Sequence, residues 1–340
     1  MNKIQWLRQR IREFRSLSEQ IGGSPLPLLL SYEIGKYRLG TSINQFYDLR
    51  LYDYSFRKQS EFLTLERQEK LIQRYFNAGA QKEDYNIFDN KHCFLKTFRD
   101  FIRRDWLYTP ESTPDDIRVF IEKHPVFVLK TDTGTMGQGV SLCRRDELDI
   151  DRFLAEHQNN PFVLEAYIQQ HPSMKALNPT SINTVRAVTA HYKGHVMIVG
   201  AGLRCGGTGS HLDNFHSGGV AYPVDIDSGI VTGVGRREAD RASFLRHPPT
   251  GHIMPGFQIP NWDILTEQIR KAATSYAPSI SRVGYVGWDV AVTPDGIDLV
   301  EGNTSPMCAL IQLDGNGVYK KLTDFIASAD KTEPLSNQMK

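Results

Sequence analysis

The sequence predicts an α+β protein with largely antiparallel sheets, preceded by a helical N-terminal region. After about residue 115, short apolar runs alternate with glycine-rich turns, which is typical of β-strands. Helical periodicity appears in that part at residues 145–157 and 262–277. Because strands outnumber crossover helices, we expect antiparallel neighbours rather than repeated βαβ units. The expected strands cover residues 126–129, 162–164, 184–190, 196–201 and 297–300.

Length and composition are those of a globular protein with more than one lobe. The 340 residues include 40 Lys+Arg and 39 Asp+Glu, and a net charge of +1 gives no electrostatic footprint for nucleic acid. No apolar run approaches the ~20 residues of a membrane span, and we expect no secretory signal. The four scattered cysteines predict a reducing, cytoplasmic setting.

Residues 4–17 have the pattern of an amphipathic helix. Apolar residues recur at helical spacing and arginines occupy the other faces: Ile4, Leu7, Ile11, Phe14 and Leu17 against Arg8, Arg10, Arg12 and Arg15. Such a helix could lie on an acidic membrane surface. Docking on its own domain is the favoured interpretation, because that is how most amphipathic helices of globular proteins use their apolar stripe. Further along, residues 62–76 predict a helix that faces solvent.

Residues 284–306 predict a hairpin with its turn at Pro294–Gly296. Asp289 on the first strand should pair near Glu301, because the turn lies midway between them. Glu301 and Asn303 are two residues apart and project from the same face. Three oxygen-bearing side chains together suit a hard cation such as Mg²⁺, with Mn²⁺ as an alternative. A hairpin with a merely polar face is the less favoured interpretation.

A glycine-rich loop follows the strand at residues 126–129. The strand leads to Lys130, and the loop contains Gly134, Gly137 and Gly139. The loop lacks the Lys and Ser/Thr that end a Walker loop and the third glycine of a dinucleotide fingerprint. What remains is the turn of a hairpin, whose amides can approach phosphates beside a lysine charge. Considered alone, the loop is better explained as a plain hairpin turn, and the phosphate interpretation gains weight only beside the predicted Mg²⁺ site.

Three charged residues on predicted strands are candidates for ligand contacts. Glu165 lies among apolar neighbours and needs a partner, for which a salt bridge and an adenine amine or ribose hydroxyl are both open. Arg186 and Arg204 lie on two later strands and are expected on the same side of a sheet. Arginine binds carboxylates and phosphates and stabilises an oxyanion, whereas an ordinary ion pair is the simpler interpretation of each.

Residues 211–223 form a polar, glycine-containing segment. Asn214, His216 and Ser217 precede the pair Gly218–Gly219, which suits close contact of the backbone with a substrate or triphosphate. His216 would serve as a proton shuttle or, in the simpler interpretation, as a hydrogen-bonding side chain.

In this order, the segments resemble the ATP-grasp superfamily, and within it the sugar-transfer-associated branch found near polysaccharide-biosynthesis enzymes. The most specific segments are LNPTSINTVRAVT, DNFHSGGVAYPVD, HPPTGHIMPGFQIPNW and VGWDVAVTPDGIDLVEGNTSP. The resemblance covers about residues 85–320 and implies two α+β lobes that clamp ATP between antiparallel sheets. The implied division is a helical region at 1–85, a small lobe at 86–167, a large lobe with the metal and substrate site at 168–330, and a flexible tail at 331–340.

The resemblance also implies roles for individual residues. Lys130 and Lys91 would contact the phosphates together with the glycines of the loop. The hinge beside adenine would consist of Glu165, Ala166 and Tyr167.

The metal ligands would be the three oxygen-bearing residues of the hairpin, because EGNTSP is similar to the metal strand of D-alanine–D-alanine ligases. Glutamate ligases that act on proteins have a similar order of residues to that of Arg186, Arg204, Asn214 and Gly218 in this sequence. Two positions depart from the family pattern. Gly287 stands where many D-alanine–D-alanine-type ligases have an arginine, so the oxyanion role would fall to Arg186 or Arg204. The pair Asn90–Lys91 replaces the commoner Asp-Lys.

The function that the resemblance implies is an ATP- and Mg²⁺-dependent carboxylate–amine ligase acting through an acylphosphate. Its substrates would be small-molecule or glycan-linked carboxylates and amines, in polysaccharide or secondary-metabolite biosynthesis. A kinase that phosphorylates a sugar or polyol hydroxyl is the alternative, and a nucleotide-binding scaffold without catalysis is the third hypothesis. The acyl donor, the amine acceptor and the oligomeric state stay open.

Overall fold

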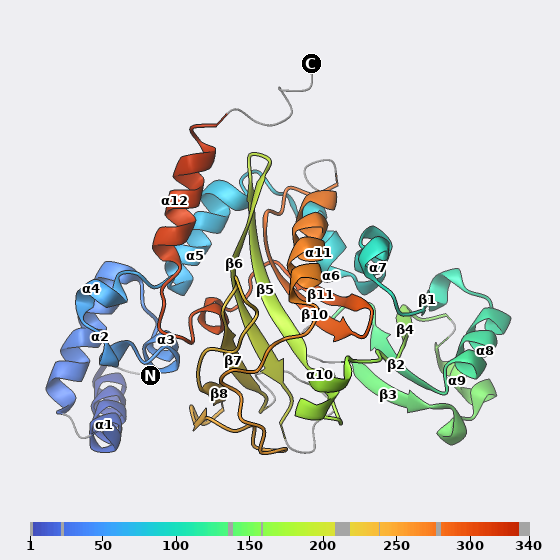
Figure 1. Ribbon diagram of the computed structural model, residues 1–340, viewed down its shortest axis with the longest axis horizontal. Helices are drawn as coiled ribbons and strands as arrows, with labels where there is room; N and C mark the ends of the chain where they lie inside the picture. Colours follow the sequence, from blue (N-terminus) through green and yellow to red (C-terminus); the bar gives the residue numbers. More distant parts are fainter. Residues whose placement is uncertain are drawn as a thin grey trace.

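The computed structural model describes residues 3–21, 24–134, 139–157, 159–207, 218–237, 239–276 and 280–332. Two β-sheets dominate it, one of four strands and one of seven. The four-stranded sheet lies at one end of the molecule, the seven-stranded sheet lies in the centre, and the helices of residues 3–59 lie at the opposite end (Figure 1). Every strand pairing in the described residues is antiparallel, which confirms the predicted fold class.

The small sheet has the strand order β1-β4-β2-β3. Its strands are β1 (Trp106–Tyr108), β2 (Val126–Thr131), β3 (Val140–Arg144) and β4 (Phe162–Ala166). Two helices cover one face, namely α8 (Pro114–Lys123) and α9 (Ile150–His157). Phe127, Leu129 and Leu164 pack against these helices. Because side chains alternate along a strand, Val126, Val128 and Lys130 point to the opposite face.

The large sheet has the order β11-β10-β5-β6-β7-β8-β9. Its strands are β5 (Thr184–Tyr192), β6 (His195–Cys205), β7 (Val220–Val224), β8 (Gly235–Arg237), β9 (Ser243–Phe244), β10 (Tyr285–Thr293) and β11 (Gly296–Asn303). The helices after the small sheet are α10 (Pro172–Leu177), α11 (Trp262–Ser275) and α12 (Tyr319–Ala329). Leu265 and Ile269 of α11 pack on one face of the sheet, whereas Leu322 of α12 packs on the other.

The N-terminal region is helical, as the sequence predicts. Its helices are α1 (Lys3–Ile21), α2 (Pro25–Leu39), α3 (Ile43–Asp48), α4 (Phe56–Gln59), α5 (Leu65–Leu71), a π-helical turn (Ile72–Phe76), α6 (Lys82–Asp89) and α7 (Lys91–Thr97). Short 3₁₀ turns occur at Leu51–Asp53, Arg99–Phe101, Thr109–Glu111, Arg145–Glu147 and Cys308–Ile311.

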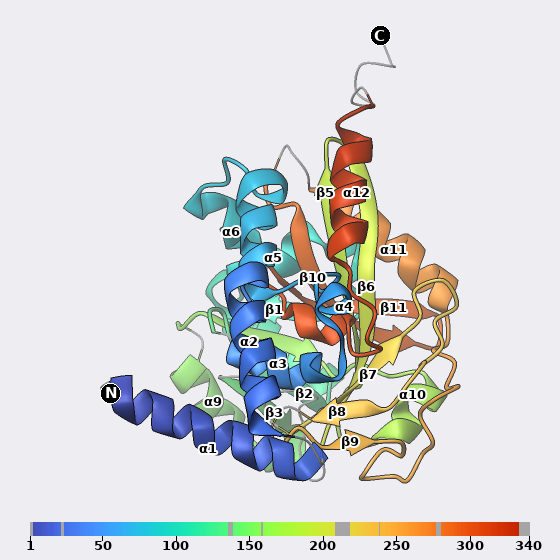
Figure 2. The same ribbon diagram turned by 90° about the vertical axis from the view of Figure 1, so that its left-hand side faces the viewer.

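The first helix docks on its own domain, as the favoured interpretation states. Phe14 and Leu17 are buried against Tyr32 and Phe46 of the next two helices. Helices α1 and α2 form the end of the molecule opposite the small sheet (Figures 1 and 2). Among the described residues, no helix combines the length and the apolar character that crossing a membrane requires.

Two helix predictions are wrong in detail. The segment 62–76 faces solvent on one side, as predicted, but Leu71, Ile72 and Phe76 on its other side are buried between the large sheet and α12. Charged residues at its exposed positions hide this apolar side in the sequence. The helix predicted at residues 145–157 starts later than expected, because a 3₁₀ turn occupies 145–147 and α9 begins only at Ile150.

Candidate functional site

The hairpin β10–β11 brings the predicted metal ligands together. Asp289 is directly opposite Glu301 in the antiparallel register, which agrees with the predicted position near 301, and a β-bulge between Asp289 and Val290 sets this exact pairing. Asn303 lies two residues further and donates from its Nδ2 to Glu301 Oε1 at 3.2 Å. Arg186 on the neighbouring strand β5 is opposite Asp289 on the other side. The site is therefore built across three adjacent strands of the large sheet.

Two buried arginines bind Asp289. Arg186 makes a bidentate contact, in which Nε donates to Oδ1 and Nη2 donates to Oδ2 at 2.8 Å. Arg204 on β6 donates from Nη1 to the same Oδ2 at 2.7 Å. Burial would raise the pKa of Asp289, but the two guanidinium charges outweigh burial and hold the pKa well below its usual range. The ion-pair interpretation of both arginines is thus confirmed, and their oxyanion role stays a prediction.

The donor set of the hairpin fits a hard cation. Asp289 remains ionised, and its carboxylate has about four lone-pair sites, of which the arginines occupy three. Asn303 and Glu301 add an amide and a second carboxylate. The described residues contain no cluster of three or more His, Cys, Asp or Glu arranged for a metal, so any cation here would need the amide and a ligand's own oxygens as well.

Glu301 differs from Asp289 in its proton affinity. Desolvation by the surrounding protein and the neighbouring Asp289 carboxylate together raise the pKa of Glu301.

Gly287 has a steric reason to differ from the arginine of D-alanine–D-alanine-type ligases. A Cβ at this position would lie 2.5 Å from the Cβ of Pro306 and 3.2 Å from the Cδ of Arg186. Real side chains do not approach so closely. The guanidinium groups at the site come instead from the neighbouring strands β5 and β6.

Lys130 and Glu165 belong to a buried ion network between the sheets. Lys130 Nζ donates to Glu165 Oε2 at 2.7 Å, and Arg104 Nε donates to the same oxygen at 2.7 Å. Arg104 also binds Asp298 on β11, through its Nη1 and, at 3.0 Å, through its backbone N–H. Burial would raise the pKa of Glu165, but the charges of Arg104 and Lys130 lower it to about 2. The salt-bridge alternative for Glu165 is what the structure contains, and a contact to adenine stays a prediction.

Arg104 is a functional candidate that the sequence did not reveal. Its side chain is buried and, besides the carboxylates of Glu165 and Asp298, it donates to the Leu299 carbonyl at 2.7 Å. The network thereby joins β2, which carries Lys130, to β11, which carries Asp298. The only signal in the sequence is the lone carboxylate of Glu165, which requires a partner but does not say which arginine supplies it.

Lys91 lies between the two halves of the site. It begins α7 and donates to the Gly134 carbonyl at 3.2 Å. Burial and, next, the neighbouring Lys130 ammonium lower the pKa of Lys91, whereas the charge of Glu301 acts in the opposite direction. These interactions place Lys91 within electrostatic reach of both Lys130 on β2 and Glu301 on β11.

Asp132 and His92 hold Lys91 in this position, and sequence reasoning missed both. The buried Asp132 carboxylate accepts from the backbone N–H of His92 at 3.0 Å and contacts its Nδ1 at 2.7 Å. The Asp132 carbonyl accepts from the Lys91 N–H at 3.0 Å. The His92 ring stacks on Tyr108 with centroids 4.2 Å apart. The start of α7 is thus fastened to the end of β2.

The glycine-rich loop is a hairpin turn between β2 and β3, as expected. Gly139 has φ +69°, and a Cβ there would lie 2.3 Å from Thr131 Oγ1, so the turn requires glycine. Gly134 is exposed and also has positive φ, whereas Gly137 lies outside the described residues. Gly218 has φ +90° at the start of β7.

Asn214 and His216 also lie outside the described residues.

A groove of about 630 Å³ separates the small sheet from the large lobe. Val126, Leu142 and Tyr167 line it on the side of the small sheet, and Lys175 lines it from α10. Of the predicted hinge residues only Tyr167 borders this groove. Ala166 packs instead on the opposite face of the sheet, against α8 and α9. The groove mixes apolar side chains with polar ones such as Arg144 and Lys175, which suits a planar base with polar edges.

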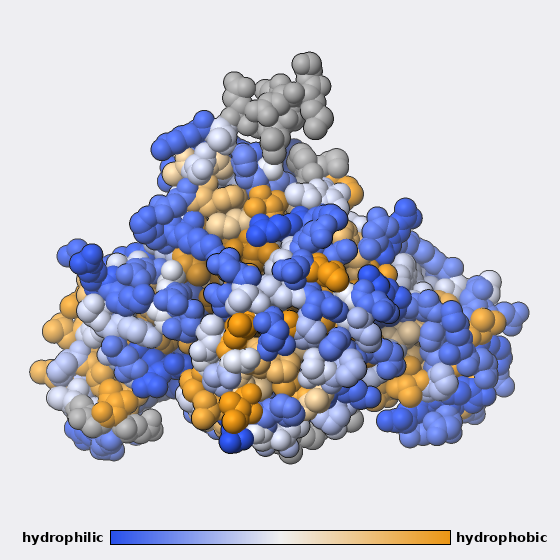
Figure 3. Space-filling view, viewed as in Figure 1, coloured by the Kyte–Doolittle hydropathy of each residue, from blue (hydrophilic) through white to orange (hydrophobic). Residues whose placement is uncertain are grey.

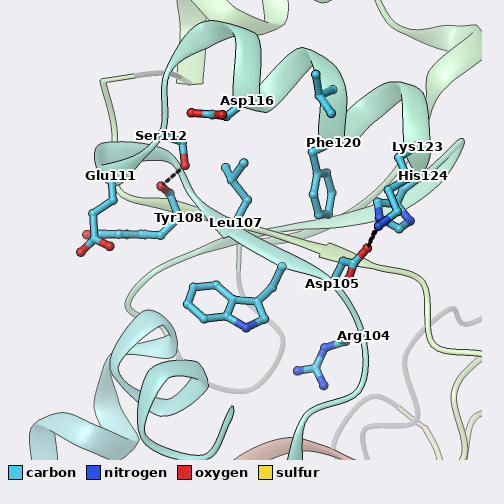
Figure 4. Close-up of a pocket in the computed structure, with 12 residues that line it drawn as sticks. Arg104, Asp105, Leu107, Tyr108, Glu111, Ser112, Asp116, Phe120, Lys123 and His124 are labelled. Carbon is cyan, nitrogen blue, oxygen red and sulfur yellow. Dashed lines mark hydrogen bonds and ion pairs between the residues drawn. The ribbon is translucent and has the colours of Figure 1, made fainter.

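A second cavity, of about 620 Å³, lies along β1 and α8 (Figure 4). Its charged groups largely neutralise one another: Asp105 contacts Lys123 Nζ at 2.6 Å and His124 Nε2 at 2.9 Å. Ser112 donates to the Tyr108 carbonyl at 2.8 Å. None of the predicted ATP or metal residues lines this cavity, so the groove beside Tyr167 is the better candidate for the nucleotide.

Comparison with known proteins supports the resemblance seen in the sequence. A family model described as sugar-transfer associated ATP-grasp matches residues 67–327. No curated protein shows significant sequence similarity to the chain. The chain is similar to a solved structure of the ATP-grasp ligase PsnB complexed with a phosphomimetic variant of its minimal precursor, Mg and ADP. The identity is 15%, the match covers 81% of this chain and 68% of PsnB, and the TM-score is 0.45.

Two further solved structures are similar. A Chryseobacterium gregarium RiPP-associated ATP-grasp ligase in complex with ADP and a leader and core peptide has 15% identity, coverage of 79% and 69%, and a TM-score of 0.45. N5-carboxyaminoimidazole synthetase from Staphylococcus aureus complexed with ADP has 13% identity, coverage of 76% and 58%, and a TM-score of 0.44. Similarities this low do not define the substrates of the chain.

Proposed function

The chain belongs to the sugar-transfer associated ATP-grasp family, and on that premise we propose that it is an ATP- and Mg²⁺-dependent ligase that joins a carboxylate to an amine. The observation that carries the proposal is the electrostatic proximity of two sets of residues. Lys91 and Lys130 come from the small-lobe side, and Asp289 and Glu301 come from the large sheet. Cations for a triphosphate and oxygens for a divalent cation are the two requirements of phosphoryl transfer.

In the proposed complex, adenine occupies the groove lined by Val126, Leu142 and Tyr167. Lys130 and Lys91 bind the phosphates together with the amides of the glycine-rich loop. In the structure Lys130 Nζ donates to Glu165. When phosphates bind, the lysine either contacts both the phosphates and Glu165 or leaves Glu165 for the phosphates. Arg104 keeps Glu165 neutralised throughout, since its own contact to that carboxylate does not involve the lysine.

Asp289, Glu301 and Asn303 would hold Mg²⁺, which supplies charge neutralisation for phosphoryl transfer when bound. Arg186 and Arg204 keep Asp289 ionised and oriented. In the proposed reaction the γ-phosphoryl group passes to a substrate carboxylate, and an amine then displaces phosphate from the acylphosphate. The arginines stabilise the oxyanion of that second step. The products are an amide, ADP and phosphate.

We further propose a cytoplasmic enzyme whose substrates are small or glycan-linked. The family description associates these proteins with sugar transfer. All four cysteines lie among the described residues and none forms a disulfide, which is compatible with a reducing compartment.

The test is phosphate release from ATP with a panel of carboxylates, including uronic acids and amino acids, and with hydroxylamine as the trapping amine. We expect an acyl-hydroxamate together with ADP. Formation of ADP with no hydroxamate for any carboxylate would count against a ligase, and phosphate retained on a sugar or polyol would identify the kinase alternative. Glu301→Gln should abolish turnover without unfolding the protein. It is preferable to Asp289→Asn, which would leave two buried arginines without their counterion.

A further inference from the structure

Helix α2 carries apolar side chains on both of its faces. Leu28, Tyr32 and Leu39 are buried in the N-terminal core. On the outer face, Leu26 is 73% exposed and Leu30 is 62% exposed. A contiguous set of exposed apolar side chains on a protein surface marks a site of contact with another protein or with lipid. Here the inner face is covered by protein, and the described part of the chain leaves the outer face open.

The outer apolar residues form a continuous stripe. Leu26, Leu30 and Ile34 follow one another at four-residue spacing along one side of the helix, and Tyr37, which is 82% exposed, continues the line. Phe56 of α4 joins Ile34 and Tyr37 at a shallow depression. We call these five residues the α2 stripe. Figure 3 shows hydrophobic side chains at this end of the molecule, bordered by hydrophilic ones.

Basic residues border the α2 stripe. Lys36 and Arg38 flank Tyr37 in the sequence, and Arg57 follows Phe56, all of them exposed. Glu33 is the acidic residue at the depression, and it lies 3.8 Å from Lys36. Within the described ranges, neither Arg38 nor Arg57 forms an ion pair.

The same end of the chain carries an excess of positive charge. Of the 40 Lys+Arg and 39 Asp+Glu of the whole chain, the first sixty residues hold ten and five respectively. The helical region that bears the α2 stripe is therefore basic, whereas the remainder is slightly acidic. This asymmetry is invisible in the net charge of +1.

We propose that the α2 stripe docks the protein on an anionic phospholipid surface. Protruding leucine, isoleucine and aromatic side chains would enter the boundary between headgroups and acyl chains, while Arg38 and Arg57 contact lipid phosphates. A second copy of the chain is a poorer occupant, because symmetric docking would bring the basic residues of both copies together. The amphipathic helix α1 is not the anchor, since Phe14 and Leu17 already pack inside.

The experiment is co-sedimentation of the full chain, without nucleotide, with vesicles of phosphatidylcholine alone or with about one third phosphatidylglycerol. We expect binding to the anionic vesicles that weakens as NaCl is raised. Leu30→Gln combined with Tyr37→Gln should lower the partition coefficient roughly tenfold or more, because each removes an apolar side chain from the lipid. Arg38→Gln and Arg57→Gln should each lower it roughly fivefold.

Matched controls come from α8, at the opposite end of the molecule (Figure 1). Val119 is 66% exposed and Arg118 is exposed beside it, so Val119→Gln and Arg118→Gln change the same chemistry away from the stripe. Both should bind vesicles like the wild type, and all variants should keep its thermal unfolding temperature.

Equal binding to both vesicle types, or no binding, would overturn the proposal. So would light scattering that shows a concentration-dependent dimer abolished by Leu30→Gln, because a second copy would then cover the stripe. The measurement does not involve ATP, so its outcome is separate from that of the ligase assay.

Discussion

Replacing Arg104 with alanine is expected to destabilise the protein by about 3–5 kcal/mol, because the change leaves two buried carboxylates without their shared cation. Glu165 and Asp298 are both buried, and they come from different sheets. Such a loss is a large part of the roughly 5–15 kcal/mol that stabilises a typical domain.

The pKa of Glu165 supports this magnitude. The charges of Arg104 and Lys130 lower the pKa of the carboxyl from 4.5 to about 2 despite its burial. That difference corresponds to roughly 3 kcal/mol. Since the native pKa lies below the unfolded value, this stabilisation is complete above the unfolded pKa and disappears as the pH falls toward the native pKa. Without the Arg104 charge, the pKa of Glu165 rises because burial disfavours its ionised form. Protonation of Glu165 then removes the buried negative charge that destabilises the variant. The difference between wild type and variant should therefore shrink below about pH 4.5.

The assay is urea unfolding followed by circular dichroism at neutral pH and at several acidic values. Arg103→Ala is the control, because this neighbouring arginine is exposed and its loss should change stability by less than about 0.5 kcal/mol. Arg104→Lys keeps the positive charge but loses the guanidinium that contacts Glu165 and Asp298 at the same time. Its loss of stability should fall between those of Arg103→Ala and Arg104→Ala. A loss below about 1 kcal/mol for Arg104→Ala, or one that stays constant with pH, would refute the reasoning.

The other predictions concern the proposed nucleotide and metal site. The affinity for Mg²⁺ should fall as the pH is lowered through the raised pKa of Glu301, because Mg²⁺ must then displace a proton. Calorimetry in buffers of different ionisation enthalpy should detect this proton release in the wild type but not in Glu301→Gln, and an affinity that does not vary with pH would contradict the prediction. Gly139→Ala should lower the unfolding free energy by about 1–3 kcal/mol and weaken the binding of a non-hydrolysable ATP analogue, because the residue has positive φ and its Cβ would collide with Thr131. An unchanged unfolding temperature and an unchanged affinity for the analogue would show that the turn relaxes freely. Gly287→Ala should cost a similar amount by displacing Pro306, measured by denaturant unfolding, and a neutral result would remove the steric reason for glycine there.

Much of the hairpin site follows from local rules. The turn at Pro294 and the alternation of side chains are sufficient to bring Asp289 near Glu301 and to put Asn303 on the same face as Glu301, whereas the exact pairing also requires a β-bulge after Asp289 that the turn does not dictate. The antiparallel sheets follow equally from strands that alternate with turns instead of helices. These features depend on residues close in sequence, whose geometry the backbone period dictates.

Residues paired across the lobes could not be predicted in this way. Glu165 visibly requires a partner, yet Arg104 lies 61 positions away and on a different element. Nor does the sequence distinguish Ala166, which packs under the sheet, from Tyr167, which borders the groove, because that depends on which face α8 and α9 cover.

The sequence by itself determined the antiparallel fold class and the proximity of Asp289 and Glu301, because periodicity and turn position control both. Its amphipathic pattern favoured the docking of α1 on its own domain without deciding it. Only the tertiary structure decided that Arg186 and Arg204 share one carboxylate, that Arg104 joins the two sheets, and that α2 keeps an apolar face outside. Burial and ion pairing between distant segments depend on how the sheets and helices stack, and a linear pattern of residues carries no record of that.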